Sequence, residues 1–214
     1  MNCCRQQHGI NQIFTPRAAR AEADEFRKKG LNERDRLLAQ ALVQRGVKDA
    51  TVLEIGGGVG GMQIELLKAG AARTIDVDIA QSYVQTAQEL AQSLGFGGQM
   101  EHQVLDFARE ADRVQPAEVV IMNRVICCYH DMPALVTPAA QHARRMLALV
   151  FPREAWWMSV GEKVMNFGMW LIRLDFRAFM HSHREIIAIV SGNGLRPTLD
   201  QHSGFWRMMI FERT

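Results

Sequence analysis

The sequence carries no strong excess of charge and no long uncharged apolar run. Its 214 residues include 25 Lys and Arg against 23 Asp and Glu, a formal net charge of +2, which is too mild to predict a nucleic-acid-binding surface. Glu162 and Lys163 interrupt the longest apolar stretch, residues 155–172, whereas a membrane span needs about 18 apolar residues. Residues 1–12 are polar and lack the apolar region of a secretory signal. We therefore expect a cytoplasmic protein without a membrane span, and association with a membrane surface stays open.

Cysteine is scarce and unusually spaced. The four cysteines form two adjacent pairs, Cys3-Cys4 and Cys127-Cys128. A chain without a secretion signal keeps its thiols reduced, so we expect no disulfide framework. Zinc sites usually take two cysteines separated by two residues, so no metal site is predicted from these pairs. Four thiols brought together by folding would instead suit a soft metal or metalloid, an alternative that the sequence leaves open.

Strand and helix patterns alternate along most of the chain. Short apolar runs predict five strands, at residues 51–55, 73–77, 102–105, 119–123 and 147–151. Helical patterns follow at residues 61–68, 79–94, 133–145 and 183–193. Two further strands, at residues 196–201 and 205–211, are close enough to form an antiparallel hairpin. The order predicts a Rossmann-like α/β fold, a mostly parallel seven-stranded sheet with helices on both faces.

An amino-terminal helical extension is expected before the first strand. Thr15 and Pro16 fit the N-cap and first position of a helix that Gly30 ends, and a second helix is predicted at residues 32–45. Residues 1–14 are predicted to be irregular. We interpret residues 1–46 as a helical cover that closes over bound ligands and residues 47–214 as the Rossmann-like domain, one folding unit.

A glycine-rich turn, Gly56-Gly57-Gly58-Val59-Gly60-Gly61, follows the first predicted strand. Such a turn brings backbone N–H groups and a helix N-terminus close to a ligand. Gly56, Gly58 and Gly61 fit the dinucleotide fingerprint, whereas Gly56, Gly58 and Gly60 fit the methyltransferase form. Two enzyme classes are therefore open, a nicotinamide-dependent oxidoreductase and an S-adenosylmethionine-dependent methyltransferase.

Carboxylates near the predicted strand ends favour S-adenosylmethionine. Glu54 lies just before the loop, where it favours a sulfonium and an ammonium over a phosphate-bearing ligand. Asp78, with Asp76 as the alternative, ends the second strand, where a carboxylate accepts hydrogen bonds from ribose hydroxyls. Asp106 follows the third strand and can meet the adenine amino group, or it is a surface carboxylate of a loop.

Four segments in this order and spacing resemble the motifs of class I S-adenosylmethionine-dependent methyltransferases: residues 52–60, 74–79, 105–107 and 123–131. The terminal hairpin is also typical of that family. The resemblance implies that Gly56, Gly57, Gly58 and Gly60 hold the methionine part of the cofactor, near Asn123. It also implies that Asp78 binds the ribose and that Asp106 and Phe107 line the adenine site. Residues 149–153 and the apolar helix after them resemble the magnesium-protoporphyrin O-methyltransferases in particular.

The chain departs from this family where the acceptor binds. Cys127-Cys128 replaces the paired histidines that often follow the fourth strand. We expect one thiol to face the acceptor, and the alternative is that both pack beneath the cofactor. Tyr129 and His130 are the candidate bases if the acceptor is protonated, and otherwise they are surface or packing residues. A methyl group on a sulfonium is already activated, so alignment with the acceptor is expected to supply most of the catalysis.

The stretch of residues 156–170 is rich in Trp, Met, Val and Phe and fits either a buried helix or a substrate cover. Basic residues follow it and fit either a site for an acidic substrate group or a solvated face: Arg173, Arg177, His181 and His183. The predicted function is methyl transfer from S-adenosylmethionine to a small, apolar or amphipathic acceptor. A nicotinamide-dependent oxidoreductase and a non-catalytic S-adenosylmethionine-binding protein are the alternatives. A nucleic-acid partner is not expected, and the oligomeric state is not predicted.

Overall fold

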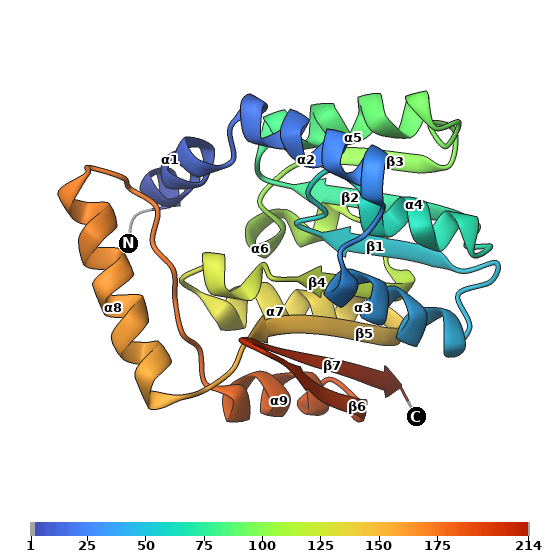
Figure 1. Cartoon of the computed structure of the whole chain (residues 1–214). Helices are drawn as coiled ribbons and strands as arrows, with labels where there is room; N and C mark the ends of the chain where they lie inside the picture. The colour runs from blue at the N-terminus through green and yellow to red at the C-terminus, as the bar shows by residue number, and fades with distance from the viewer. Residues whose placement is uncertain (1–2, 214) are drawn as a thin grey trace.

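A seven-stranded sheet lies at the centre of the structure, a computed structural model that describes residues 3–213 apart from the side chains of residues 3–7, 156 and 159 (Figure 1). The strands are β1 (Thr51–Ile55), β2 (Arg73–Asp78), β3 (Met100–Val104), β4 (Ala117–Asn123), β5 (Ala143–Pro152), β6 (Leu195–Ser203) and β7 (Trp206–Arg213). Their order across the sheet is β3-β2-β1-β4-β5-β7-β6, with β7 antiparallel to both of its neighbours. The predicted mostly parallel sheet with a carboxyl-terminal hairpin is therefore confirmed.

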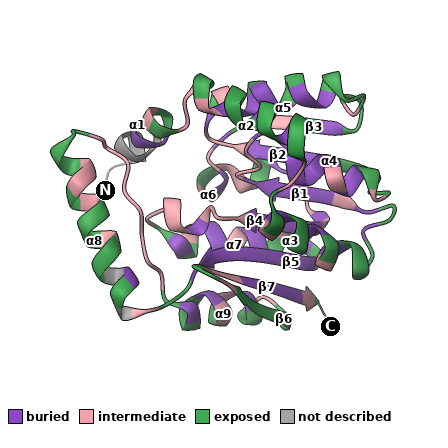
Figure 2. Ribbon diagram, viewed as in Figure 1, coloured by how far each residue is buried: buried purple, intermediate pink, exposed green. Residues whose placement is uncertain are grey.

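Helices cover both faces of the sheet. They are α1 (Cys3–Ile13), α2 (Pro16–Lys29), α3 (Glu33–Gln44), α4 (Gly61–Lys68), α5 (Gln81–Ser93), α6 (Phe107–Glu110), α7 (Met132–His142), α8 (Trp156–Leu171) and α9 (His183–Gly192). Side chains alternate along each strand. Val52 of β1 therefore packs in one apolar cluster with α2–α5, and Leu53 packs in a second cluster with α6, α7 and α9. The central strands β1, β4 and β5 are buried on both faces, as their near-continuous apolar sequences require (Figure 2).

The amino-terminal helices share the core of the sheet. Thr15 caps α2 through a hydrogen bond from the Ala18 amide at 3.3 Å, as the sequence predicts. Ala19, Ala23 and Phe26 of α2 are buried in the same cluster as β1. The amino-terminal helices are thus packed against the sheet.

The prediction that residues 1–14 are irregular is wrong for residues 3–13, which form α1. A distant part of the chain supports this helix. Ile10 is buried, a Cβ at Gly9 would overlap the backbone of Phe176, and Gln12 Oε1 accepts a hydrogen bond from the Asp175 amide at 2.7 Å. Short helices depend on such tertiary packing, which local sequence does not reveal.

The boundaries around β5 and β3 also differ from the prediction. α7 ends at His142 rather than residue 145, and β5 begins at Ala143 rather than residue 147. Ala143 pairs with Ala117 of β4, and Arg145 of the extended strand donates to the Arg45 carbonyl at 3.0 Å. Pairing with β4 therefore extends β5 through charged residues that resemble a helix end. β3 covers residues 100–104 rather than 102–105 because its pairing with β2 begins at Met100.

α8 stands at the margin of the molecule (Figure 1). Residues 172–182, called here the return segment, run back from the end of α8 to α9 and lie between α8 and the rest of the structure. α8 is therefore not the buried helix that its apolar sequence allowed.

Candidate cofactor and acceptor site

The glycine loop turns sharply between β1 and α4. Gly56, Gly58 and Gly60 have φ angles of 70°, 60° and 78°, in the left-handed region that glycine adopts without strain. The Gly56 amide donates to the Val77 carbonyl at 2.7 Å. A Cβ at Gly56 would overlap the Val125 side chain, so glycine here lets the loop approach the segment that follows β4.

Three polar side chains are buried directly beneath this loop. Glu54 is 2% exposed, and Gln63 and Asp76 are 0% exposed. A Cβ at Gly57 would overlap both Asp76 Oδ1 and Gln63 Nε2. Burial, and then the neighbouring Asp76, raises the pKa of Glu54 well above its usual value. Burial also raises the pKa of Asp76, although the His102 ring 3.2 Å away opposes this shift.

Two cavities meet at Gly56, at the carboxyl ends of β1, β2 and β4. The larger, of about 360 Å³, lies between the glycine loop and helices α2 and α3. Its volume is within the range of small-molecule sites. Its polar lining includes Glu22, Asp35, Glu54, Asn123 and Arg124. The smaller, of about 60 Å³, is lined by Asp78, Asp106, Phe107, Cys128 and Tyr129 among others.

The two candidate ribose ligands occupy different places. Asp78, at the end of β2, lines the smaller cavity, and its carboxylate accepts from the Ala80 amide at 2.8 Å and the Gly58 amide at 3.4 Å. Burial, and then Asp76, raises the pKa of Asp78 to about 7. Each carboxylate oxygen keeps a further lone pair for a ligand hydroxyl. Asp76 lines neither cavity and binds His102 beneath the loop instead.

Asp106 and Tyr129 meet across the smaller cavity. Asp106 caps α6 by accepting from the Ala108 amide at 3.2 Å. The Tyr129 hydroxyl lies 3.0 and 2.9 Å from the two Asp106 carboxylate oxygens and donates to them. Phe107 lines the same cavity and is nearly buried. The loops after β3 and β4 are therefore joined at this cavity.

A carboxylate on α3 joins the amino-terminal helices to the end of β4. Asp35 is 6% exposed and accepts from Asn123 Nδ2 and from Arg124 Nη2, each at 3.0 Å. Asn32, the N-cap of α3, donates to the same carboxylate at 2.6 Å. Arg124 itself has a φ of 65°, which is rare for a residue with a side chain.

Asp35, Arg124 and Glu22 were not among the site residues predicted from the sequence. Burial raises the pKa of Glu22, and a hydrogen bond from Tyr83 opposes the shift. One signal could have revealed Asp35, because it occupies the same helix face as the apolar Leu38 and Leu42. A carboxylate on an apolar helix face indicates a buried polar partner.

The cysteines after β4 point to different sides. Cys127 and Cys128 end a short 3₁₀ helix, η2 (Ile126–Cys128), and their Sγ atoms are 4.0 Å apart. Cys128 lines the smaller cavity, whereas Cys127 lines a separate apolar recess between the end of β5 and the return segment. The side chains of Cys3 and Cys4 lie outside the described part of the chain, so the proposed meeting of all four thiols stays a prediction.

His130 lies beside the two cavities without lining either of them. Its ring packs against Tyr129 at a centroid distance of 5.6 Å and against Phe179 of the return segment at 6.4 Å. The return segment also contacts the loop after β4 directly. The Phe179 amide donates to the Cys127 carbonyl at 2.8 Å, and the His181 ring lies 2.8 Å from the Tyr129 carbonyl.

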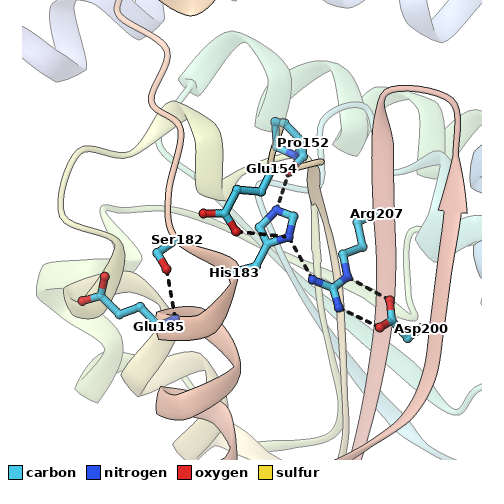
Figure 3. Close-up of polar contacts among 7 residues, drawn as sticks. All are labelled: Pro152, Glu154, Ser182, His183, Glu185, Asp200 and Arg207. Atoms are coloured by element: carbon cyan, nitrogen blue, oxygen red, sulfur yellow. Dashed lines mark hydrogen bonds and ion pairs between the residues drawn. The ribbon is translucent and has the colours of Figure 1, made fainter. Parts of the chain in front are cut away.

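A second polar network holds the ends of the α8 excursion (Figure 3). His183 Nε2 lies 2.8 Å from the Pro152 carbonyl, and Arg207 donates to His183 Nδ1 at 2.8 Å. Arg207 also binds Asp200 through two hydrogen bonds of 2.8 and 2.7 Å. Burial, with a contribution from Arg207, lowers the pKa of His183. The ring therefore ties the end of β5 to the hairpin and to the start of α9, rather than meeting a substrate as the sequence allowed.

Comparison with known proteins places this geometry in a family. The model of the family described as "Methyltransferase domain" matches residues 23–199. No curated protein matches the chain significantly. The family match spans most of the chain and includes the glycine loop and most residues that line the two cavities.

Solved structures share the fold at low sequence identity. Magnesium protoporphyrin IX methyltransferase from Synechocystis PCC 6803 with bound SAH has a TM-score of 0.67 and 24% identity over 84% of this chain and 81% of that one. An O-methyltransferase family protein from Burkholderia thailandensis has a TM-score of 0.72 and 17% identity over 96% of this chain and 63% of that one. Geranyl diphosphate C-methyltransferase from Streptomyces coelicolor A3(2) has a TM-score of 0.65 and 13% identity over 84% and 79%. The chain belongs to the class I S-adenosylmethionine-dependent methyltransferases.

Proposed function

We propose that this protein transfers the methyl group of S-adenosylmethionine to a small, apolar or amphipathic acceptor. The observation that carries the proposal is the pair of cavities that meet at Gly56. Carboxyl groups line the larger cavity on the loop side and on the helix side, which suits a ligand with a sulfonium and an ammonium. The smaller cavity offers Asp78 and Asp106 as acceptors, which suits a nucleoside with hydroxyl and amino donors.

An unpaired buried atom supports this fit. Asn123 Oδ1 is buried and has no hydrogen-bond partner among the described residues, and Asn123 lines the larger cavity. Buried acceptors are usually paired, so this oxygen is suited to a donor on a ligand. We therefore assign Asn123, with the backbone of Gly56, Gly57, Gly58 and Gly60, to the amino-acid part of the cofactor. We assign Asp78 to the ribose, and Asp106 with Phe107 to the adenine.

The residues of the chain contribute to the reaction mainly by position. S-adenosylmethionine, when bound, supplies a methyl group that its sulfonium has already activated for transfer. The contacts of Tyr129 with Asp106 and of His181 with the Tyr129 carbonyl hold the loop after β4 in place, and such alignment supplies most of the rate enhancement in a displacement. Because the Tyr129 hydroxyl donates to a carboxylate, we assign Tyr129 to positioning. His130 is then the proposed base for an acceptor that must lose a proton.

The surroundings of the loop after β4 favour an acceptor with apolar surface. Phe179 and Met180 of the return segment are half-buried apolar side chains beside Cys127. Two of the structural relatives are named after the compounds protoporphyrin and geranyl diphosphate. Each compound combines an apolar body with anionic groups. We therefore expect an acceptor of amphipathic character.

Binding and transfer can be tested separately. Calorimetry with S-adenosylmethionine, S-adenosylhomocysteine and NAD is expected to give heat for the first two alone. A screen with methyl-labelled cofactor against thiols, carboxylates, phenols and metalloid oxyanions is then expected to label a member of one class. Tight NAD binding without S-adenosylmethionine binding would contradict the proposal. Cofactor binding without transfer to any acceptor would favour the non-catalytic alternative.

The affinity for S-adenosylmethionine is expected to rise with pH through neutrality. Asp78 must be ionised to accept hydrogen bonds from both ribose hydroxyls, and its pKa in the ligand-free protein is about 7. About one tenth of the carboxyl is ionised at pH 6, so the Kd should fall about tenfold between pH 6 and pH 8. Calorimetry across this range measures the effect. Asp78→Asn removes the ionisation of residue 78 but leaves Asp76 and Glu22 in place. If the Kd of this variant still fell with pH as in the wild type, Asp78 would be excluded as the cause.

Bound S-adenosylhomocysteine is expected to protect Cys128 from alkylation more than Cys127. Cys128 lines the smaller cavity, whereas Cys127 lines the apolar recess. Because the two residues are adjacent, labelling with iodoacetamide should be followed in Cys127→Ala and Cys128→Ala separately. We expect the ligand to slow labelling of Cys128 about fivefold or more and labelling of Cys127 less than about twofold. Equal rates with and without ligand in both variants would show that neither thiol faces the site.

A further inference from the structure

α8 turns two polar side chains, Glu162 and Asn166, inward together with two methionines, whereas most of its large apolar side chains turn outward. At 100° per residue, four side chains form its inward stripe: Met158, Glu162, Asn166 and Met169. Met158 is buried, and Asn166 exchanges two hydrogen bonds with the Ala178 backbone of the return segment, at 2.8 and 2.9 Å. Glu162 accepts from Asn166 Nδ2 at 3.0 Å. This stripe packs on the return segment.

The opposite side of α8, which we call the outward stripe, is apolar along its whole length. Its members are Trp157, Val160, Val164, Phe167 and Leu171, and each is more than half exposed. Trp170 and Ile172 extend it at the carboxyl end and are 60% and 70% exposed. In Figure 2 the ribbon of α8 is coloured as exposed over most of its length. A contiguous apolar surface of this size marks an interaction site.

The charges of α8 are segregated in the same way. The helix contains two charged residues, Glu162 and Lys163. The acid faces inward, whereas Lys163 is exposed at the border of the outward stripe. Arg173, two residues after the helix, is also exposed, and before the helix Arg153 and Glu154 are both exposed. Lys163 and Arg173 are the cations nearest the apolar surface, and they make it complementary to an anionic partner.

The outward stripe is fixed in its orientation. The network around His183 fastens both ends of the excursion that carries α8, because it joins Pro152 to the residue that follows the return segment (Figure 3). The return segment is held against α1 through Asp175. The His8 ring of α1 lies 2.9 Å from the Asp175 carboxylate. The stripe therefore faces solvent while α8 rests on this segment, and it does not line the cofactor cavities.

We propose that α8 docks this protein on an anionic phospholipid bilayer through its outward stripe. An interfacial helix carries Trp, Phe and Leu on one face and Lys or Arg at its border, and α8 has both features. Within residues 3–213 no helix is long and apolar enough to cross a membrane, so α8 lies on the surface. Its 16 residues extend about 24 Å along the bilayer plane.

A second copy of the chain fits this surface less well. A stable dimer interface buries about 800 Å² on each partner, whereas two convex helices that cross bury only the facing strip of each. A flat bilayer surface accepts every side chain of the stripe at once, to a depth of about 5–10 Å. The outward stripe also does not serve as a substrate cover, because it points away from the cavities.

Docking through α8 would bring the return segment, rather than the cofactor cavities, close to the membrane. The return segment contacts α8 through Ala178 and the loop after β4 through Phe179 and His181. An amphiphilic acceptor that leaves the bilayer would then meet the return segment before it reaches the loop after β4. This route rests on the proposed function, whereas the docking itself does not.

Vesicle flotation of the full chain tests the docking without any acceptor. We expect wild-type protein to float with vesicles of phosphatidylcholine and phosphatidylglycerol, and to bind pure phosphatidylcholine at least about tenfold more weakly. Val164→Ser/Phe167→Ser should weaken binding to the mixed vesicles at least about tenfold. Both side chains are exposed, so circular dichroism and cofactor binding should match wild type. Leu37→Ser/Val43→Ser on α3 removes two partly exposed apolar side chains elsewhere and should leave flotation unchanged.

Three outcomes would overturn the proposal. Wild-type protein could fail to float with the mixed vesicles, or the α8 variant could float as well as wild type. Light scattering could also show a dimer that the α8 variant converts to a monomer, without vesicle binding, and a second copy would then be the occupant. None of these measurements depends on methyl transfer. Failure of the proposed function would appear instead as vesicle binding by a protein that does not bind S-adenosylmethionine.

Discussion

Asp78→Ala is expected to weaken S-adenosylmethionine binding by about 1.5–3 kcal/mol, or about 10- to 150-fold in Kd, the range for hydrogen bonds to a charged group. The carboxylate lies at the end of β2 on the wall of the smaller cavity, held by the amides of Ala80 and Gly58. Alanine removes both acceptors that the ribose hydroxyls would use, and the backbone offers no substitute there. Calorimetric titration with S-adenosylhomocysteine measures the change without turnover.

Two comparisons make this result specific. Asp78→Asn keeps an acceptor for the Ala80 amide and should lose less affinity than alanine. Asp76→Asn alters the buried cluster beneath the loop, where Asp76 binds His102. We therefore expect it to lower the midpoint of thermal unfolding and to leave the affinity for the cofactor nearly unchanged. If Asp76→Asn abolished binding while Asp78→Ala left it unchanged, the ribose contact would have to move two residues along β2.

Asp35→Ala is expected to lower the free energy of unfolding by about 1.5–3 kcal/mol and to weaken cofactor binding as well. The buried carboxylate accepts hydrogen bonds from Asn32, Asn123 and Arg124. Its loss leaves the Asn123 amide without this partner and releases α3 from the end of β4. Because Asn123 and Arg124 both line the larger cavity, the same substitution should disturb the site. Urea unfolding and calorimetric titration measure the two effects.

Asp24→Ala is the matched control for this substitution. Asp24 is an exposed carboxylate of α2 that pairs with Arg27 in the same amino-terminal region, and exposed pairs of this kind contribute little. Its replacement should therefore change stability by less than about 0.5 kcal/mol. A double-mutant cycle that combines Asp35→Ala with Arg124→Ala should give a coupling free energy of about 1 kcal/mol. The coupling is modest because Arg124 is about one-third exposed. A cycle without coupling would show that the pair does not join the helices to the site.

The order of strands and the position of the cofactor loop could be predicted because they depend on local signals. Val52, Leu53 and Ile55 form a short apolar run that ends in glycine, and such a run identifies a buried strand and a tight turn without tertiary information. The same is true of α2, whose Thr15 cap and terminal Gly30 both act within one turn of the helix. Asp76 and Asp78 could both be proposed as ligands because they lie at the end of the second predicted strand.

The site beyond these strand ends depends on contacts between distant residues. Asp35 lies 88 positions from Asn123, and Asp106 lies 23 positions from Tyr129, so neither partner follows from spacing. The distinction between Asp76 and Asp78 also needed the structure, because the two side chains share a strand face and differ in how far each lies from the end of β2. The helical state of residues 3–13 belongs here too, since Asp175 and Phe176 support it.

The sequence by itself determined the fold class, the cofactor loop and the methyltransferase family, because strand periodicity, glycine conformation and strand-end carboxylates are properties of neighbouring residues. The tertiary structure alone decided which way α8 faces. Its sequence is equally compatible with a buried helix and a substrate cover, since periodicity identifies an apolar stripe but not what covers it. The return segment occupies the polar side of α8 through Asn166 and Ala178, and this contact leaves the apolar side outward.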